Sequence, residues 1–374
     1  MFIKRKNVNN NFGYEIEFIP VGSGRSGDAI LVRYGVQGNY KIMIVDGGTK
    51  ESGENLVDHV KKYYKTNYVD YVVNTHPDQD HASGLTKVLN NLEVGELWIH
   101  CPWNYAKEII EFIDDEKNNY TRDQRITFKS FERRLAGSYY KYAKELENIA
   151  KEKNITIKEP YKGCKIGDFE VLSPSRDWHL FDLIINSDKT EGLGKTEDSR
   201  QKTLLFESLK DKIFNVVENL NIETLKDGGV TSRENESSVI LYANFNGKGI
   251  LLTGDAGNEA LEKAYNFNPD IYKNLSFIQI PHHGSRKNNS PKILNQIIGK
   301  IGERPENSIT AFVSAGENDE NHPRRMVVNA FIRRGCKVIQ TKGKTIQHFK
   351  NMPEREGWVS ATPLSIFDKV ESYE

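Results

Sequence analysis

Short apolar runs alternate with polar segments along most of the chain, and this pattern predicts many short strands. The runs that predict strands cover residues 29–34, 41–45, 68–73, 96–100, 169–172, 238–242, 249–253, 276–280, 310–314 and 337–340. Runs this short, rich in β-branched residues and bounded by turn formers, favour strands over buried helices. Many short strands separated by fewer helices predict stacked sheets with helices outside them.

A smaller set of segments has helical periodicity, with apolar residues three or four positions apart. The predicted helices cover residues 56–64, 128–153, 203–220 and 325–334. The segment 128–153 has the clearest helical pattern, because Leu135, Tyr139, Tyr142, Leu146 and Ile149 are spaced to share one face.

Two long segments differ in character from the strand-rich parts. Residues 103–160 are charged and helical, and residues 176–234 are polar and rich in Lys, Asp, Glu and Gly. We therefore expect a single domain over residues 1–374 that carries a helical insertion at 103–160 and a polar insertion at 176–234.

Composition indicates a globular protein, with 37% apolar and 28% charged residues. Lys plus Arg equals Asp plus Glu at 52 each, so no overall positive field attracts nucleic acid. An anionic substrate must therefore be held by local groups or metal ions. No stretch approaches the roughly 20 apolar residues of a membrane span, so no membrane partner is expected.

Cysteine usage favours a reducing compartment. Cys101, Cys164 and Cys336 are far apart and form no C-x-x-C pair, which predicts reduced, buried thiols and no disulfide framework or cysteine zinc knuckle. The residues after Met1 lack the apolar run of a signal peptide. These features predict a cytoplasmic location.

Four residues of metal-ligand type lie directly after the strand predicted at 68–73. They are His76, Asp78, Asp80 and His81. A tight turn at the end of a strand would bring these side chains into one small volume, where clustered carboxylates and imidazoles need cations to neutralise them. The alternative is a solvated acidic turn that contains two histidines, but the density of the cluster favours a metal site.

Two later strands also end in residues of ligand type. Asp255 follows the strand 249–253, and His282 and His283 follow the strand 276–280. Each element is weak alone, since Asp after Thr-Gly is often only a turn former. Three such strand ends in one chain are harder to dismiss, and together they predict one metal site.

With these motifs the sequence resembles the metallo-β-lactamase superfamily, whose hallmark is His-x-His-x-Asp-His. It resembles the branch that includes the hydrolase domain of the competence DNA-uptake channel protein, which tends to carry aspartate at the second histidine, as at Asp78. The resemblance also covers 22–31, 45–48, 235–239, 253–255, 281–285 and 321–323. It implies an α+β fold, the four-layer αββα sandwich, and is less informative about substrate.

Position by position, the resemblance implies two divalent metal ions. One ion would be held by His76 and Asp78 and the other by Asp80 and His81, with Asp255 bridging both. Two ions of this kind would activate a bridging hydroxide, which implies a metal-dependent hydrolase.

The remaining ligands are open at this point. One of His282 and His283 would complete the second site, and Asp46 would accept a hydrogen bond that orients a ligand histidine. The family usually supplies a third histidine to the first site, but His179 is the only histidine between residues 173 and 255, and its context matches no family motif. An oxygen-rich first site suits Mn²⁺. Zinc is the expected metal, with manganese as its rival.

A leaving group needs a proton, and two histidines are candidates for its donor. They are whichever of His282 and His283 binds no metal, and His322 in Asn-His-Pro. The candidate catalytic residues are therefore Asp80, His283 and His322.

Local charges favour a phosphodiester substrate. Ser285 and Arg286 follow the paired histidines, and Arg324 follows His322 and Pro323. Arginine and hydroxyl groups bind phosphate oxygens well, although ordinary solvated surface charges are the alternative. The resemblance to the competence-channel branch also implies a nuclease-like activity. We therefore expect a phosphodiesterase or nuclease that acts on nucleic acid or a nucleotide.

Three other functions are compatible with parts of the pattern. A thioester or ester hydrolase of the same fold would use the same metal site. A non-catalytic metal-binding interaction module would use the helical insertion for docking. A flavin-linked diiron oxidoreductase is disfavoured, because such proteins typically carry Glu at the position of Asp78 and no segment here qualifies as a flavin domain.

Overall fold

The computed structural model describes residues 11–118, 120–190, 193–195 and 215–372. Its core is formed by two seven-stranded mixed sheets. The first sheet has the order β17 (Ile346–Lys350), β1 (Phe12–Phe18), β2 (Ala29–Val36), β3 (Asn39–Gly47), β4 (Tyr68–Val73), β5 (Glu93–Trp98) and β7 (Thr156–Lys158). Strands β3, β4, β5 and β7 run parallel to one another.

The second sheet has the order β16 (Cys336–Gln340), β15 (Ile309–Val313), β14 (Leu275–Gln279), β13 (Lys248–Leu252), β12 (Ile240–Phe245), β9 (Phe169–Ser173) and β8 (Lys165–Ile166). Its strands β13 to β16 are parallel. The structure confirms the strands predicted in both sheets, with shifts of up to a few residues at their ends.

Apolar side chains on alternate strand positions fill the space between the two sheets. Ile16, Phe18 and Val32 from the first sheet share a buried cluster with Phe277 and Phe312 from the second. Because side chains alternate between faces, the intervening Leu31 and Ile44 belong instead to the cluster under the helices of the first sheet.

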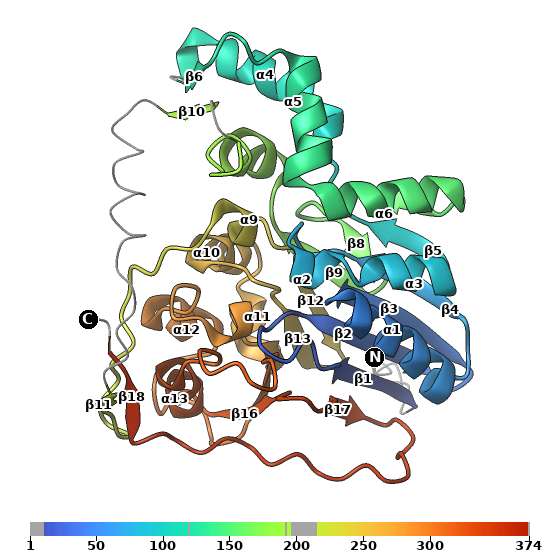
Figure 1. Ribbon diagram of the computed structural model, residues 1–374. Coiled ribbons are helices and arrows are strands. Elements are labelled where there is room, and N and C mark those ends of the chain that lie inside the picture. Colours follow the sequence, from blue (N-terminus) through green and yellow to red (C-terminus); the bar gives the residue numbers. More distant parts are fainter. Residues whose placement is uncertain (1–10, 119, 191–192, 196–214, 373–374) are drawn as a thin grey trace, which may run out of the picture.

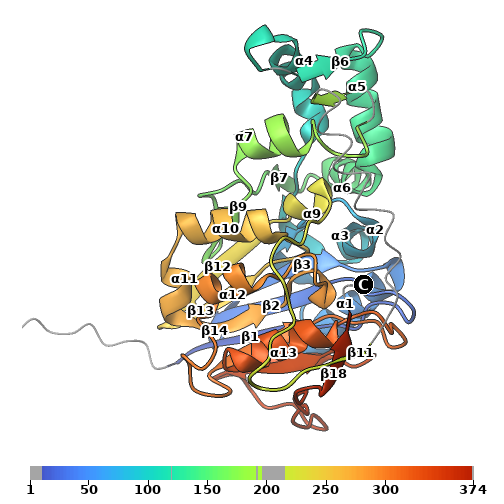
Figure 2. The same cartoon turned by 90° about the vertical axis from the view of Figure 1, so that its left-hand side faces the viewer.

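Helices cover the outer face of each sheet (Figures 1 and 2). On the first sheet they are α1 (Lys50–His59), the π-helix η1 (Val60–Tyr64), α2 (Gln79–Ala82), α3 (Leu85–Asn91) and α6 (Lys141–Glu152). On the second they are α10 (Asn258–Phe267), α11 (Asp270–Asn274), α12 (Pro291–Ile297) and α13 (Arg325–Arg333). This is the predicted α+β sandwich of four layers.

Parts of the two insertion segments pack against each other beyond the sheets. Their remaining elements are η2 (Pro102–Tyr105), α4 (Ala106–Asp114), η3 (Glu116–Asn118), β6 (Tyr120–Arg122), α5 (Phe128–Arg134), η4 (Leu135–Tyr139), α7 (Arg176–Trp178), η5 (His179–Leu183) and β10 (Leu193–Lys195). Strand β6 pairs with β10, and the rings of Phe112 and Phe181 stack at 4.4 Å. In Figure 1, α4, α5 and β6 project from the upper end of the molecule.

Several local predictions differ from the structure. The helix predicted at 128–153 is broken at Tyr140, whose φ of −121° and ψ of 34° lie outside the helical region. Residues 156–158, counted within the helical insertion, form β7 of the first sheet. The predicted strand 96–100 ends at Trp98.

The chain near residue 215 also departs from the prediction. Of the helix predicted at 203–220, residues 203–214 lie outside the described residues, and β11 (Asn215–Val217) is a strand that pairs with β18 (Lys369–Glu371). The short helices α9 (Arg233–Glu236) and η6 (Pro281–Gly284) complete the described elements. Within the described ranges, no helix combines the length and hydrophobicity that a membrane span requires.

Candidate metal centre

The candidate centre lies where the carboxyl ends of parallel strands from the two sheets meet. Asp46 is near the end of β3, and Thr75 and His76 follow β4. Asp255 follows β13, and η6, which contains His282 and His283, follows β14. In open α/β sheets, ligands bind outside the carboxyl ends of parallel strands, so the topology itself brings these residues together.

Asp46 organises the turn after β4. Its carboxylate accepts hydrogen bonds from the Thr75 backbone N at 2.8 Å, Thr75 Oγ1 at 2.5 Å and His81 Nδ1 at 2.8 Å. Its φ of 58° is a conformation that few side chains adopt, and such backbone is typical of functional sites. The hydrogen bond to Nδ1 leaves Nε2 of His81 as the available ring nitrogen, as expected for an acceptor that orients a metal ligand.

Asp255 occupies the middle of the centre, and its two carboxylate oxygens face different imidazoles. Oδ2 lies 3.9 Å from His76 Nε2 and 3.4 Å from His282 Nε2. Oδ1 lies 3.4 Å from His81 Nε2 and 3.5 Å from His283 Nε2. The carboxylate is therefore flanked by two pairs of imidazole nitrogens, one pair on each oxygen.

The ring of His282 is oriented by asparagine side chains. Asn288 uses its amide NH₂ to donate to the backbone carbonyls of Asp255 and Ala256, so its Oδ1 is directed at His282 Nδ1, 2.8 Å away. That oxygen can only accept, which places the proton on Nδ1 and leaves Nε2 with its lone pair. His282 and His283 have φ of 48° and 53°, so both lie in the left-handed region.

Six buried polar atoms in this part of the structure have no hydrogen-bond partner among the described residues. They are His76 Nε2, His81 Nε2, both ring nitrogens of His283, Asp255 Oδ1 and Asp28 Oδ1. Leaving a buried polar atom unpaired costs roughly 1–3 kcal/mol, so several in one place indicate a missing partner. Imidazole nitrogens and carboxylate oxygens are the ligands of zinc and similar ions, and these residues fit such a cofactor.

The ionisation of these groups suits cation binding. Burial acts to raise the pKa of Asp255, but the neighbouring His282, His283 and His81 hold it well below its usual value. Burial lowers the pKa of His283 to about 3 and also lowers that of His76. Asp255 and Asp46 hold the pKa of His81 well above its usual value, against the effect of burial. Metal ligation requires an ionised carboxylate and neutral imidazoles, so a bound cation would take the place of the proton on His81.

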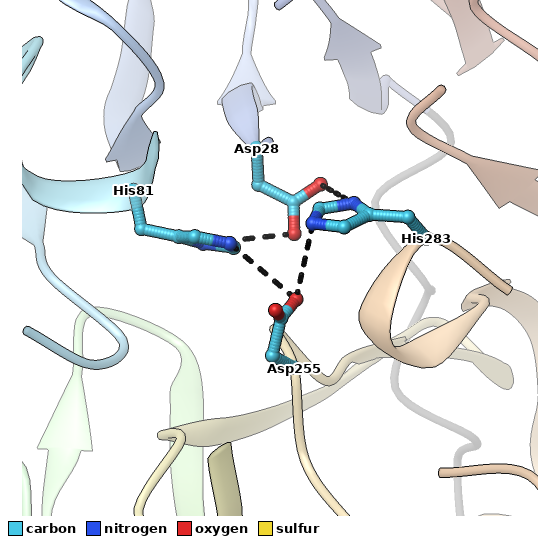
Figure 3. A group of neighbouring side chains, drawn as sticks. All are labelled: Asp28, His81, Asp255 and His283. Atoms are coloured by element: carbon cyan, nitrogen blue, oxygen red, sulfur yellow. Dashed lines mark ion pairs between the residues drawn. The ribbon is translucent and has the colours of Figure 1, made fainter. Parts of the chain in front are cut away.

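Asp28 belongs to the centre, although the sequence did not single it out as a ligand. It lies 3.8 Å from His81 Nδ1 and 4.0 Å from His283 Nδ1, opposite Asp255 across the two rings (Figure 3). Gln279 Nε2 donates to its Oδ2 at 2.7 Å, and burial raises the pKa of Asp28 to about 7. Its position at the end of the glycine-rich turn 22–31 was the signal available in the sequence.

The acidic residues of the 76–81 turn occupy different positions. Asp78 Oδ2 lies 3.8 Å from His76 Nε2, and its Oδ1 lies 2.7 Å from Nζ of Lys189. Asp80 is in α2, where its backbone oxygen accepts from Asp28 N at 3.3 Å. Among the described residues, the two groups with potential ligand atoms within 4.8 Å of one another do not include the Asp80 carboxylate.

The described part of the chain contains two groups of side chains whose potential ligand atoms lie within 4.8 Å of one another. One contains Asp28, His81, Asp255 and His283, and the other contains Asp46, His76 and His81. His179 is in neither group and lies instead against His100. Lys189, from the predicted polar insertion, is a further residue of the site that the sequence did not indicate.

His322 lies at the side of the centre, held by an acid. Its Nδ1 is 3.1 Å from Asp319 Oδ2, which also accepts from Ser26 Oγ at 2.8 Å. The ring lies 6.3 Å from those of both His282 and His283. Burial lowers the pKa of His322, while Asp319 acts to raise it.

The candidate phosphate-binding residues have different surroundings. Ser285 is buried directly after η6. Arg286 donates to the backbone oxygen of Ser372 at 2.7 Å, which directs it to the C-terminal segment. Arg324 is buried before α13, and its positive charge contributes to the low pKa of His322.

Residues 22–128 match the family model described as Metallo-beta-lactamase superfamily. Over these residues, the match supports the resemblance to this superfamily that the motifs indicated. Asp255, His282 and His283 lie beyond the matched residues, and the geometry above connects them to the matched part.

The chain is also similar to ComE operon protein 3 of Bacillus subtilis (strain 168), at 27% identity over 183 residues. The match covers 48% of this chain and 20% of that protein, so the chain spans only a part of its length. Among solved structures, the metal-dependent hydrolase of the beta-lactamase superfamily Tm1679 matches at 12% identity and TM-score 0.42, over 90% of this chain and 98% of that one. The metallo-beta-lactamase fold protein YhfI from Bacillus subtilis matches at 9% identity and TM-score 0.39, over 90% of this chain and 100% of that one.

Proposed function

We propose that this protein is a phosphodiesterase that cleaves nucleic acid or a nucleotide with two divalent metal ions bound on either side of Asp255. The observation that carries the proposal is the arrangement around Asp255, whose oxygens each face two imidazole Nε2 atoms. A carboxylate shared by two cations would need separate ligands beside each of its oxygens, and the two pairs of imidazoles could supply them.

The division assigns candidate ligands to two adjacent sites. His76, Asp78 and His282 would hold the first ion with Asp255 Oδ2, because their atoms lie on that side. His282 would then take the place of the histidine that the first site was expected to lack, and would be its second imidazole.

The second ion would be held by His81 and His283 with Asp255 Oδ1. Two carboxylates are further candidate ligands of that site. Asp80 is implied by the resemblance, and Asp28 is supported by its closeness to His81, Asp255 and His283. Four imidazoles favour Zn²⁺ as the metal, and the carboxylates keep Mn²⁺ as the rival.

Divalent ions bound here would lower the pKa of a coordinated water and neutralise charge that develops on the substrate. The protein's own part is to hold the ligands rigidly and to place other groups around the reacting bond. Asp46, Thr75 and Asn288 fix the rings of His81, His76 and His282 through their Nδ1 atoms. Rigid ligands of this kind reduce the reorganisation that the reaction requires.

His322 is suited to protonate the leaving group. Asp319 accepts from its Nδ1 and fixes the ring, so Nε2 is the nitrogen that exchanges a proton with the substrate. Because burial lowers the pKa of His322, the protonated ring gives up its proton readily.

Two cations favour a phosphodiester over an acyl substrate. The ammonium of Lys189 is 2.7 Å from Asp78 on one side, and the buried Arg324 is near His322 on the other. A phosphodiester is anionic before attack and gains from both charges, whereas an ester or thioester is neutral at the reacting group. Hydrolysis of esters or thioesters by the same centre is the alternative, and the experiment below compares the two substrate classes.

The test uses the full chain, stripped of metal by chelation and reloaded with Zn²⁺ or Mn²⁺. Substrates are bis-p-nitrophenyl phosphate, labelled DNA and RNA oligonucleotides, p-nitrophenyl acetate and an acyl thioester. Phosphodiester turnover should depend on added metal and be lost in Asp255→Asn, while Asp270→Asn on the exposed surface of α11 should match the wild type. Turnover of acyl substrates alone, or phosphodiester turnover that survives Asp255→Asn, would refute the proposal.

A further inference from the structure

A second pair of histidines lies at the same edge of the first sheet, outside the centre described above. His100 follows β5, the strand next to β4, and His179 begins η5 in the second insertion segment. Their ring centroids are 4.3 Å apart with an angle of 40° between the planes. His76 and His81 in the candidate metal centre have nearly the same relation, at 4.1 Å and 54°.

Three of the four ring nitrogens in this pair are buried and without a hydrogen-bond partner among the described residues. They are Nδ1 and Nε2 of His100 and Nε2 of His179. His100 is 6% exposed and His179 is fully buried. Each unpaired buried nitrogen costs roughly 1–3 kcal/mol, so this arrangement implies a bound partner that satisfies several of them at once.

The fourth nitrogen is held in a way that prepares His179 as a ligand. Glu159 accepts from the Tyr161 hydroxyl at 3.4 Å, so the phenol oxygen is left to accept from His179 Nδ1, 3.3 Å away. This places the proton of His179 on Nδ1 and the lone pair on the buried Nε2. Asp46 does the same for His81 in the candidate centre, where the unpartnered atom is also Nε2.

The low pKa values of His100 and His179 keep both rings neutral, and this limits which kinds of ligand could bind their unpaired nitrogens. Burial lowers the pKa of His179 to about 3 and lowers that of His100 well below its usual value. Neutral rings with available lone pairs do not attract anions. They are the form in which histidine binds transition-metal ions.

We propose that His100 and His179 form a separate site for an imidazole-preferring metal ion, Zn²⁺ foremost. The site would connect the end of β5 to the insertion segment that contains α7 and η5. That segment is already fastened to α4 by the paired hydrogen bonds of Arg176 to Glu108 and by the stack of Phe112 on Phe181. A metal here would fix the insertion beside the candidate centre without belonging to it. With two protein imidazoles it should bind more weakly than the centre around Asp255.

The experiment counts ions and locates them, and it does not depend on activity. The metal-free full chain is loaded with excess Zn²⁺, and bound zinc per chain is measured by plasma mass spectrometry. His179→Phe should bind one ion fewer than the wild type. Asp255→Asn should lose zinc from the main centre and keep the ion at His100 and His179, so failure of this proposal is distinguishable from failure of the proposed function.

Two further variants serve as controls. One tests the effect of removing a buried imidazole elsewhere, and the other tests the hydrogen bond that sets the tautomer of His179. His348→Phe removes a different ring with a buried, unpartnered Nε2 that lies among Phe277, Phe312 and Tyr14, and it should bind as many ions as the wild type. Tyr161→Phe leaves both imidazoles but removes the group that orients His179, so zinc affinity at this site should fall about tenfold.

Crystals of the zinc-loaded wild type give the decisive result without any variant. Anomalous scattering at the zinc edge should show a peak in contact with both rings. Ordered water alone between His100 and His179, or equal zinc content in wild type and His179→Phe, would overturn the proposal.

Discussion

His81 donates from Nδ1 to Asp46 at 2.8 Å, and Nε2 of the same ring lies 3.4 Å from Asp255. One end of the imidazole is thus fixed by the first sheet, and the other end faces a residue from the second sheet. The hydrogen bond to Asp46 sets the direction in which the ring can bind a metal ion. His76 and His282 are also held at Nδ1, by Thr75 and Asn288 respectively, and each has Nε2 facing Asp255.

Asp46→Asn should therefore weaken metal binding while leaving the fold intact. An amide can still accept from His81, but it loses the charge that holds the imidazole tautomer and strengthens the ligand. We expect a loss of 10- to 100-fold in zinc affinity, measured by competition with a chromophoric chelator. Asp168→Asn, at an exposed turn between β8 and β9, is the matched control and should bind as the wild type does. Equal affinities in the two variants would remove the role assigned to Asp46.

Lys189 should contribute to binding of a charged substrate rather than to binding of metal. Its Nζ lies 2.7 Å from Asp78 Oδ1, while the other oxygen of Asp78 faces His76. Lys189→Met should raise KM for phosphodiesters about tenfold with little change in KM for neutral esters, and Lys189→Arg should restore much of the loss. If the Met variant instead loses a bound metal ion, Lys189 acts by positioning Asp78.

Asp319 and His322 should act on the leaving group, and the choice of leaving group tests this. A p-nitrophenolate leaves without a proton, whereas the sugar hydroxyl of a nucleotide needs one. His322→Gln should reduce kcat on oligonucleotides by about 10²-fold or more and leave turnover of bis-p-nitrophenyl phosphate nearly unchanged. Asp319→Asn should show a smaller effect in the same direction. Equal losses on both substrates would assign these residues a structural role.

His348 provides a prediction on stability that does not involve metal. Burial, with Lys337 and Lys248 nearby, lowers the pKa of His348 from 6.5 to about 4. The unfolded chain binds a proton below pH 6.5 and the folded protein does not, so stability falls as pH decreases from 6.5 to 4. The contribution is at most about 3 kcal/mol. Urea unfolding of His348→Phe across this range should show a shallower pH dependence than the wild type. Parallel profiles would contradict the depressed pKa.

Much of the sheet framework could be predicted from the sequence, because buried β-branched runs between turn formers identify strands directly. Strand β1 could not, since its pattern contains Glu15 and Glu17, which are fully buried. They are acceptable there because Arg33 pairs with Glu15, and Arg355 pairs with both acids. These partners come from another strand and from the C-terminal segment, so only the folded chain explains why the strand is stable.

Some residues of the candidate site could be predicted from the sequence and others could not. Asp255, His282 and His283 could be named in advance because each follows a predicted strand. Asp28 and Lys189 could not, because their roles depend on which loops meet above the sheets. The pairing of His179 with His100 likewise joins an insertion to the end of β5. Local pattern carries no information about contacts between segments so far apart.

The central claim is that Asp255 is shared by two metal ions, and anomalous diffraction from zinc-loaded crystals tests it most directly. The account predicts two zinc peaks flanking this carboxylate, one in contact with His76 and His282 and the other in contact with His81 and His283. The absence of zinc beside Asp255, or a single ion bound without it, would contradict the account.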